Sequence, residues 1–334
     1  MIISKAPLRM SFLGGGTDLP SYYRKHGGMV VSTSIDKYVF VTINRKFDDG
    51  IRVSYSVTEI VERVSELKHP LVKAALGLMN IDSGVEITSI ADIPSSGTGL
   101  GSSSSFTVAL LQVLSAYKGE SCKPDRLGAD AYKVEVDLCG APIGKQDQYS
   151  AAYGGMNLIE FHQDDTVGVT PVVCKPEYMR EFESQILSFY TGRTRSASNI
   201  LQLQSARSAN DEQVIDALSM MKGLAVNFVE SLCAGDYRAI GAILNEGWVL
   251  KRGLSEGISD TAIDRYYDAA MKEGAYGGKL LGAGGGGFLM IQAPVDRHEA
   301  IRRALSDLRY IRLPFSTEGA RIIFYHPPNA NDCD

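Results

Sequence analysis

The sequence has few cysteines and no long apolar run. Its five cysteines are odd in number, lie far apart and never have CxxC spacing, so they indicate neither a disulfide framework nor a zinc site: Cys122, Cys139, Cys174, Cys233 and Cys333. No stretch approaches the roughly 20 apolar residues that span a membrane, and the N-terminus has no basic segment followed by a long apolar one. We therefore expect a cytoplasmic protein with free or buried thiols and no membrane partner.

The sequence also lacks an excess of basic residues. Its formal net charge is -5, with 44% apolar and 22% charged residues, a composition typical of soluble globular proteins. This charge argues against nucleic acid as a partner, and so against an RNA-binding protein. A chain of 334 residues is longer than most single domains, which favours two lobes that share one cleft, as in an enzyme.

The two halves of the chain differ in periodicity. The first half reads as strands between glycine-rich turns, notably at residues 29–44 and 85–90, with a helix over residues 106–117. The second half reads as helices and then as a tail that resembles a split β-α-β unit. Its expected helices are 196–207, 211–232, 237–248 and 259–273, and its tail elements are 288–292, 295–308, 310–314 and 321–325. We place the domains at residues 1–175 and 176–334.

A glycine- and serine-rich loop, IPSSGTGLGSSSS, precedes the helix of the first half. Its alternating glycines let amide N–H groups approach an anion, and the helix N-terminus adds partial positive charge, so a triphosphate suits this site. The loop has no Walker lysine, and the chain has no HRD or DFG signature of protein kinases. A flexible linker is the alternative. The residues expected at the nucleotide are Pro94, Ser96, Gly97, Gly99, Leu100, Gly101, Ser102, Ser103 and Ser104.

Two further glycine-rich segments, KAPLRMSFLGGGTDLP and KLLGAGGGGFLMI, lie near the two ends of the chain. With the middle loop they make three motifs whose order and spacing resemble the GHMP kinases, over nearly the whole chain from Lys5 to Phe288. The resemblance implies an α+β, two-domain fold. Its N-terminal ATP-binding domain would be like ribosomal protein S5 domain 2, and its C-terminal domain ferredoxin-like with extra helices.

The resemblance also implies a phosphoryl-transfer site. Asp147, followed by Gln148, matches the element whose aspartate faces the acceptor hydroxyl, and Arg9 is the candidate for a neutralising cation. Lys5 is expected to supply a second cation, because residues i and i+4 of a strand share a face. ATP binds as its magnesium complex, and Mg2+ takes few protein oxygen ligands. By resemblance these are Ser103 and Glu135, with Asp137 as the alternative to Glu135.

The first motif bears on the acceptor. Its small glycines make the first motif resemble that of the sugar-1-kinases that phosphorylate heptose 7-phosphates. The resemblance implies a role in making surface polysaccharide such as capsule. The alternatives are a fucokinase- or galactokinase-like hexose 1-kinase and a non-catalytic sugar-binding relative. A phosphorylated sugar needs cations of its own, and Arg193 and Arg195 precede a predicted helix N-terminus. A homodimer is left open. The expected acceptor residues are Gly14, Gly15, Gly16, Thr17, Asp18, Arg193, Arg195, Gly284, Gly285 and Gly286.

Overall fold

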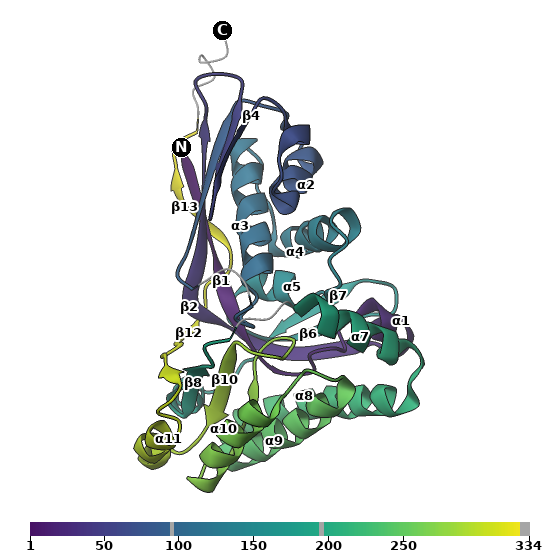
Figure 1. The fold of residues 1–334 in the computed structure, drawn as a ribbon, viewed down its shortest axis with the longest axis vertical. Coiled ribbons are helices and arrows are strands. Elements are labelled where there is room, and N and C mark those ends of the chain that lie inside the picture. The colour runs from purple at the N-terminus through teal and green to yellow at the C-terminus, as the bar shows by residue number, and fades with distance from the viewer. Residues whose placement is uncertain (94–96, 194–196, 328–334) are drawn as a thin grey trace.

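Two long antiparallel strands form the frame of the molecule. The structure is a computed structural model that describes residues 1–93, 97–193 and 197–327, so Pro94, Ser96 and Arg195 lie outside the described residues. Strands β1 (Ile2–Leu13) and β2 (Gly28–Arg45) pair along their length and run through the first half of the molecule (Figure 1). Residues 29–44 therefore form a strand, as predicted.

These strands belong to a nine-stranded sheet. The main strand order is β13-β1-β2-β5-β3-β4. In addition, β12 and β6 pair with β2, and β7 pairs with β6. Strands β3 and β5 are parallel, and the other pairs are antiparallel. The remaining strands of the sheet are β3 (Ile51–Ser54), β4 (Thr58–Val61), β5 (Val85–Ala91), β6 (Met156–Phe161), β7 (Val167–Pro171), β12 (Phe315–Ser316) and β13 (Arg321–Tyr325).

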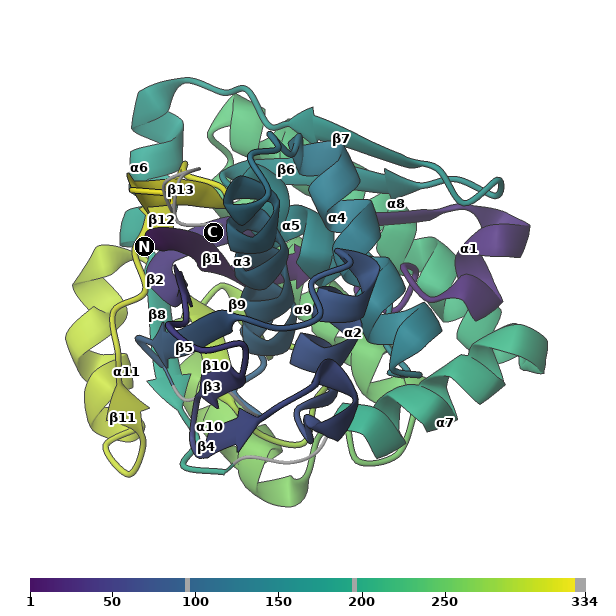
Figure 2. The same cartoon turned by 90° about the horizontal axis from the view of Figure 1, so that it is seen from above.

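Helices cover one face of this sheet. Helix α3 (Ser102–Tyr117) is buried on most of its surface because it contacts β1 and β2 as well as its neighbouring helices (Figures 1 and 2). Its predicted helical spacing is confirmed. The other helices and helical turns of this half are α1 (Pro20–His26), the turn η1 (Val64–Glu66), α2 (Pro70–Leu78), α4 (Pro124–Tyr132), the π-helical turn η2 (Lys133–Leu138) and α5 (Gln146–Tyr153).

The second half is mainly helical, as predicted, around a four-stranded antiparallel sheet of order β11-β8-β10-β9. Its strands are β8 (Ile186–Tyr190), β9 (Gly277–Leu280), β10 (Phe288–Gln292) and β11 (Arg309–Tyr310). Its helices are α6 (Pro176–Ser184), α7 (Ala197–Asn210), α8 (Glu212–Ala234), α9 (Tyr237–Leu254), α10 (Thr261–Lys272), the turn η3 (Val295–Arg297) and α11 (His298–Ala304). No helix in the described part of the chain is long and apolar enough to cross a membrane.

The tail of the chain is divided between the two sheets. Strands β10 and β11 flank β8 and are joined through α11, which confirms a split β-α-β unit for these elements. The prediction that residues 321–325 extend this unit is wrong, because β13 pairs with β1 in the first sheet. The boundary at 175/176 stays a prediction, but the last described strands lie on the first sheet.

An aromatic cluster joins the two halves. The Phe12 ring of β1 lies 5.1 Å from Phe228 of α8 and 5.4 Å from Phe182 of α6, and Phe315 of β12 lies 6.0 Å from Phe12. Phe12, Phe182 and Phe228 are fully buried in one core. The two halves are therefore joined by one continuous apolar core.

Candidate active site

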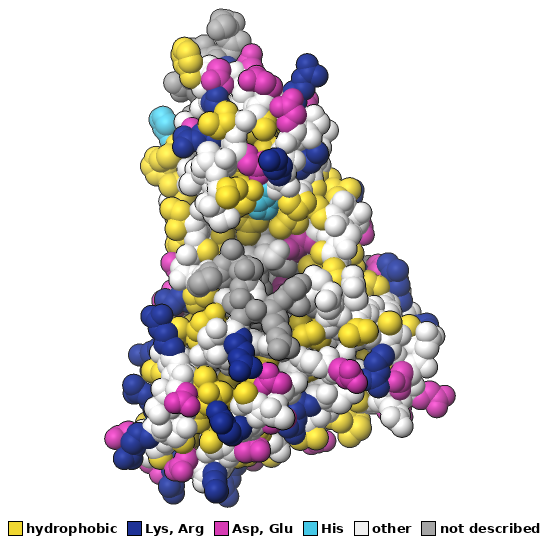
Figure 3. All heavy atoms as spheres, in the orientation of Figure 1, with side chains coloured by type: hydrophobic (Ala, Val, Ile, Leu, Met, Phe, Trp, Pro, Cys, Tyr) yellow, Lys and Arg dark blue, Asp and Glu magenta, His cyan; other side chains and the backbone are white. Residues whose placement is uncertain are grey.

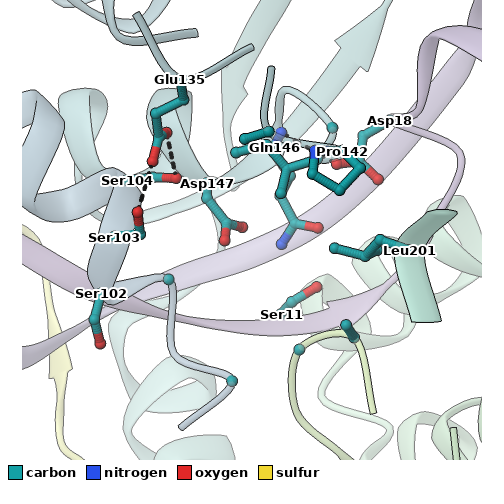
Figure 4. A pocket seen from close by; sticks show the side chains of 18 of the residues that line it. Ser11, Asp18, Ser102, Ser103, Ser104, Glu135, Pro142, Gln146, Asp147 and Leu201 are labelled. Carbon is teal, nitrogen blue, oxygen red and sulfur yellow. Dashed lines mark hydrogen bonds between the residues drawn. The ribbon is translucent and has the colours of Figure 1, made fainter. Parts of the chain in front are cut away.

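A cavity of about 650 Å³ lies where the predicted motifs meet. It is lined by parts of the first motif, the Gly/Ser loop, the 141–147 loop, α7, α9 and the start of the third motif. Figure 4 shows Asp147 in this cavity, between the Ser103, Ser104 and Glu135 cluster on one side and Gln146 and Asp18 on the other.

The Gly/Ser loop has the backbone that an anion site requires. Gly97, Gly99 and Gly101 all have positive φ, between 71° and 77°, which favours glycine. Helix α3 begins at Ser102 without a side-chain cap, so its first N–H groups lack helical partners and border the cavity. Of the described residues predicted at the nucleotide, only Leu100 does not line the cavity: its side chain is in the core, and its carbonyl accepts the Arg9 N–H at 3.0 Å.

Arg9 and Asp147 form a two-pronged ion pair beside this loop. Arg9 Nε donates to Asp147 Oδ1 at 2.8 Å, and Arg9 Nη2 donates to Asp147 Oδ2 at 2.7 Å. Arg9 Nη1 donates to the Gly99 carbonyl at 2.6 Å. A Cβ on Gly101 would lie 3.3 Å from Asp147 Oδ2. The ion pair is therefore held in one orientation at the edge of the Gly/Ser loop.

Glu135 is a buried carboxylate in the π-helical turn η2. It accepts from Ser103 Oγ at 2.9 Å, Ser104 Oγ at 2.7 Å and Gln148 Nε2 at 2.6 Å. Burial raises its pKa, and among the described residues no Lys or Arg nitrogen lies within 4 Å of it. Asp137, the alternative, is exposed. Residues two apart on a helical turn lie on nearly opposite faces, so buried Glu135 faces inward and exposed Asp137 faces outward, which favours Glu135.

This donor set fits Mg2+ held together with phosphate. One carboxylate and one hydroxyl suffice when phosphate oxygens and water complete the coordination, and a cation would balance the uncompensated charge of Glu135. Among the described residues there is no group of three or more His, Cys, Asp or Glu side chains that could hold a metal by themselves. The site is therefore suited to a metal that arrives with its nucleotide.

The first motif is partly structural. Asp18 lines the cavity, accepts from the Gly16 N–H at 2.8 Å and the Gln146 N–H at 3.3 Å, and has its pKa raised by burial. Thr17 is fully buried and bonds the Gly14 and Met29 carbonyls. A Cβ on Gly14 would lie 1.9 Å from the Met29 carbonyl oxygen. Gly14 and Thr17 therefore shape the turn, while Gly15, Gly16 and Asp18 face the cavity.

The third motif packs against the middle one. A Cβ on Gly99 would lie 2.3 Å from the Leu281 carbonyl oxygen, and one on Gly287 would lie 2.3 Å from the Thr98 carbonyl oxygen. Gly282 and Ala283 line the cavity. The predicted acceptor residues Gly284, Gly285 and Gly286 do not line it: they approach the backbone of Ile258, which lies between α9 and α10, or of Arg193, which follows β8.

Two predicted cations also lie outside the cavity. Lys5 Nζ is 2.5 Å from Glu318 Oε2 and stacks on Tyr38. Lys5 shares strand β1 with Arg9, but four residues of strand span roughly 13 Å. The β1–β2 register also shifts between Pro7 and Leu8, so sharing a strand does not bring Lys5 to the position of Arg9. Arg193 is half exposed and pairs with Asp260 at 3.0 Å. Neither cation is brought to Asp147.

The cavity also contains residues that the sequence analysis did not select. Lys251 of α9 is buried, and its Nζ donates to the Gly282 carbonyl at 2.8 Å. Gln146 and Gln204 line the cavity with buried side-chain nitrogens that lack a partner in the described structure. One signal was readable in advance, because Lys251 falls on the buried stripe of its helix with Ile240, Leu244 and Leu254.

A second cavity of about 410 Å³ adjoins the first, and the two share Leu71, Ser102 and Ser103. Its wall includes Tyr55, His69 and Phe106, with ring centroids 4.6 Å apart for Tyr55–His69 and 5.3 Å for His69–Phe106. Apolar side chains form a band across this part of the molecule, at the level of α2 (Figure 3). This cavity was not predicted, since its residues come from five separate segments.

Comparison with known proteins gives matches over most of the chain. Residues 58–155 match the model of the GHMP kinases N terminal domain, and residues 228–310 match GHMP kinases C terminal. The D-glycero-alpha-D-manno-heptose 7-phosphate kinase of Campylobacter jejuni is 29% identical, over 96% of this chain and 98% of that protein. The L-fucokinase/L-fucose-1-P guanylyltransferase of Bacteroides fragilis is 27% identical, over 96% of this chain and 38% of that protein.

Solved structures agree with these matches. A D-glycero-D-manno-heptose 1-phosphate kinase from Bacteroides thetaiotaomicron superposes with a TM-score of 0.81 at 27% identity, over 98% of this chain and 100% of that one. The mixed α and β two-domain fold is therefore shared along the whole length.

Proposed function

This chain belongs to the GHMP kinases, and we propose that it transfers the γ-phosphoryl group of ATP to the anomeric hydroxyl of D-glycero-D-manno-heptose 7-phosphate. The product is the 1,7-bisphosphate, an intermediate for nucleotide-activated heptose and for surface polysaccharide such as capsule. The expected compartment is the cytoplasm, where ATP is available.

The observation that carries the proposal is the position of Asp147. Its carboxylate stands at the edge of the phosphate loop, oriented by both prongs of Arg9. In the transfer, the acceptor oxygen bonds to the γ-phosphorus, the bond from that phosphorus to the β-phosphate oxygen breaks, and the hydroxyl proton passes to Asp147. Arg9 holds the carboxylate in place and adds positive charge near the transferred group.

The two adjoining cavities suggest how ATP lies. Its phosphates would occupy the Gly/Ser loop, and its base the second cavity, where Phe106 and the Tyr55 and His69 rings offer apolar surface. Ser103 and Glu135 would hold Mg2+ between the two, where the ion would offset phosphate charge. Family members use ATP as donor, whereas the metal remains our proposal.

The acceptor is proposed from the two relatives at 29% and 27% identity that are named as a heptose 7-phosphate kinase and a heptose 1-phosphate kinase. The second candidate is an unphosphorylated hexose such as fucose, which rests on the fucokinase match at 27% identity.

The test is ADP release from purified protein with ATP, Mg2+ and a panel of sugars and sugar phosphates. We expect turnover with the heptose 7-phosphate, and a fall in kcat of roughly 10²–10⁴ for Asp147→Asn, because this change removes the proton acceptor but keeps the shape. Asp82→Asn is the matched control, since Asp82 is exposed between α2 and β5.

Three outcomes separate the alternatives. Release of no ADP with any acceptor would reject the kinase proposal. Preference for an unphosphorylated hexose would retain the kinase and reject the heptose phosphate. Full activity of Asp147→Asn would reject the role of Asp147.

A further inference from the structure

The acceptor side of the cavity holds a buried cation that forms no direct ion pair, although Asp18 and Asp147 act on it electrostatically from further away. Lys251 is 5% exposed, and its Nζ makes one hydrogen bond, to the Gly282 carbonyl, which leaves two N–H donors. Among the described residues no carboxylate oxygen lies within 4 Å of it. Burying an ammonium without a paired anion is costly, so its presence in a ligand cavity indicates that a ligand supplies the negative charge.

The other cation lining this cavity within the described residues is already engaged. Arg9 uses three of its nitrogens on Asp147 and Gly99. Arg193, predicted to bind the phosphate of the acceptor, pairs with Asp260 outside the cavity. Lys251 is therefore the cation lining the cavity, within the described residues, whose charge no directly paired carboxylate offsets.

Polar side chains from other elements line the same cavity. The position of a Cβ on Gly15 is 3.4 Å from Lys251 Nζ, 3.8 Å from Gln146 Oε1 and 3.9 Å from Ser11 Oγ. Gln204 Nε2 lies 2.1 Å from the corresponding position on Gly16. Gln146 is 4% exposed and Gln204 1%, and the side-chain nitrogen of each has no partner in the described structure. A buried donor without a partner is costly, which independently indicates a ligand.

We propose that Lys251, with Gln146, Gln204 and Ser11, binds the phosphate group that the acceptor sugar carries away from its reacting hydroxyl. This rests on the proposed function and deepens it, because it makes the kinase selective for phosphorylated sugars. The chemistry recognised is a phosphate monoester, and the γ-phosphoryl group of ATP has similar chemistry. Lys251 bonds Gly282, which contacts Gly99 of the Gly/Ser loop, but the acceptor is favoured because Lys251 Nζ also adjoins Gly15 of the first motif.

The consequence is that the cavity selects for sugars that carry a phosphate, because other sugars leave its buried polar groups without partners. A sugar without a phosphate leaves the ammonium and two amides without partners, which penalises its binding more than the loss of one attractive contact. The small Gly15 keeps this space open, since a side chain there would displace the ligand from Lys251.

The experiment compares Lys251→Met with wild type, using heptose 7-phosphate and the same heptose without phosphate. We expect KM for the phosphorylated sugar to rise roughly 10–100-fold, the value for loss of a charged hydrogen bond. KM for the plain sugar should not rise, because the variant removes the unpaired ammonium that penalises its binding. Calorimetric titration of each sugar without ATP gives the same comparison independently of turnover. Lys272→Met, on an exposed lysine of α10, is the matched control.

The outcomes are distinct. An equal loss of kcat with both sugars would assign Lys251 to the transferred phosphoryl group and overturn the proposal, as would unchanged constants. If wild type turns over a plain hexose alone, the kinase stands and this inference fails. If wild type turns over nothing, the proposed function fails, and phosphate-dependent binding that Lys251→Met abolishes would still support the anion site. Thermal melts of both variants check that the fold is retained.

Discussion

Single residues in the cavity have charges that burial disfavours. Burial raises the pKa of Asp18 and Glu135 and lowers that of Lys251 to about 8. Titratable groups with perturbed pKa values gather at functional sites, because the charge of a bound ligand can offset the charge of the buried group. Here Mg2+ would offset the negative charge of Glu135, and an acceptor phosphate would offset the positive charge of Lys251.

The lowered pKa of Lys251 predicts how stability depends on pH. Between about pH 8 and its ordinary pKa of 10.5, the unfolded chain holds this proton and the folded chain does not, so the contribution of Lys251 to the free energy of unfolding rises with pH. Asp18, Arg9 and Asp147 act on it electrostatically. Below pH 8 the full cost of the buried ammonium is present.

We therefore expect Lys251→Met to be more stable than wild type at pH 7, by an amount that shrinks as pH rises through 8 toward 10.5. Urea unfolding at pH 7, 8.5 and 10 measures the difference. The comparison with wild type is needed because the pKa of Lys279, also buried, is lowered mainly by burial and additionally by the Lys251 charge. A stability difference independent of pH would contradict the prediction.

At the scale of elements, the middle and third motifs depend on each other through backbone contact. Gly99 has φ of 76°, and a Cβ there would meet the Leu281 carbonyl oxygen at 2.3 Å. A side chain on Gly99 must move either the phosphate loop or the turn at Gly282. Each motif therefore sets the shape of the other.

Gly99→Ala is expected to raise KM for ATP at least tenfold and to lower stability, because strain and clash act together. Gly119→Ala is a well-matched control, since Gly119 has φ of 75° and nothing within 4 Å of its Cβ position. It should cost about 1–2 kcal/mol of stability for the left-handed backbone alone and leave KM for ATP unchanged. Steady-state kinetics and urea unfolding measure both variants. Equal effects would show that the contact with Leu281 has no role.

At the scale of the whole molecule, the C-terminal strands fasten the second half to the first sheet. Strand β13 pairs with β1, and Phe315 joins the aromatic cluster around Phe12. The chain therefore crosses between the two halves again after β11, and local damage to the tail should affect both.

Truncation after residue 314 removes β12 and β13, and we expect it to lower the melting temperature by roughly 5 °C or more, because an edge of β1 and part of the core are exposed. Truncation after residue 327 keeps both strands and is the control. Circular dichroism melts compare the two. An unchanged melting temperature for the shorter chain would show that the tail does not join the halves.

Local pattern predicted much of this fold. The strand at residues 29–44, the helix after the Gly/Ser loop and the helices of the second half were readable because periodicity reports which face of an element is buried. The sheet to which residues 321–325 belong was not readable, because short strands carry no mark of their partner. The second cavity was also missed, because its residues come from five separate segments of the chain.

The sequence by itself determined the backbone of the Gly/Ser loop, because Gly97, Gly99 and Gly101 before a helix N-terminus favour positive φ through local geometry. It also identified Asp147 and Arg9 by resemblance, and the fold then joined them. Only the tertiary structure decided which other cations serve the site. Lys5 is paired with Glu318, whereas Lys251 is buried unpaired beside Gly15. The role of a charge depends on its partners and burial, which come from residues far apart in the chain.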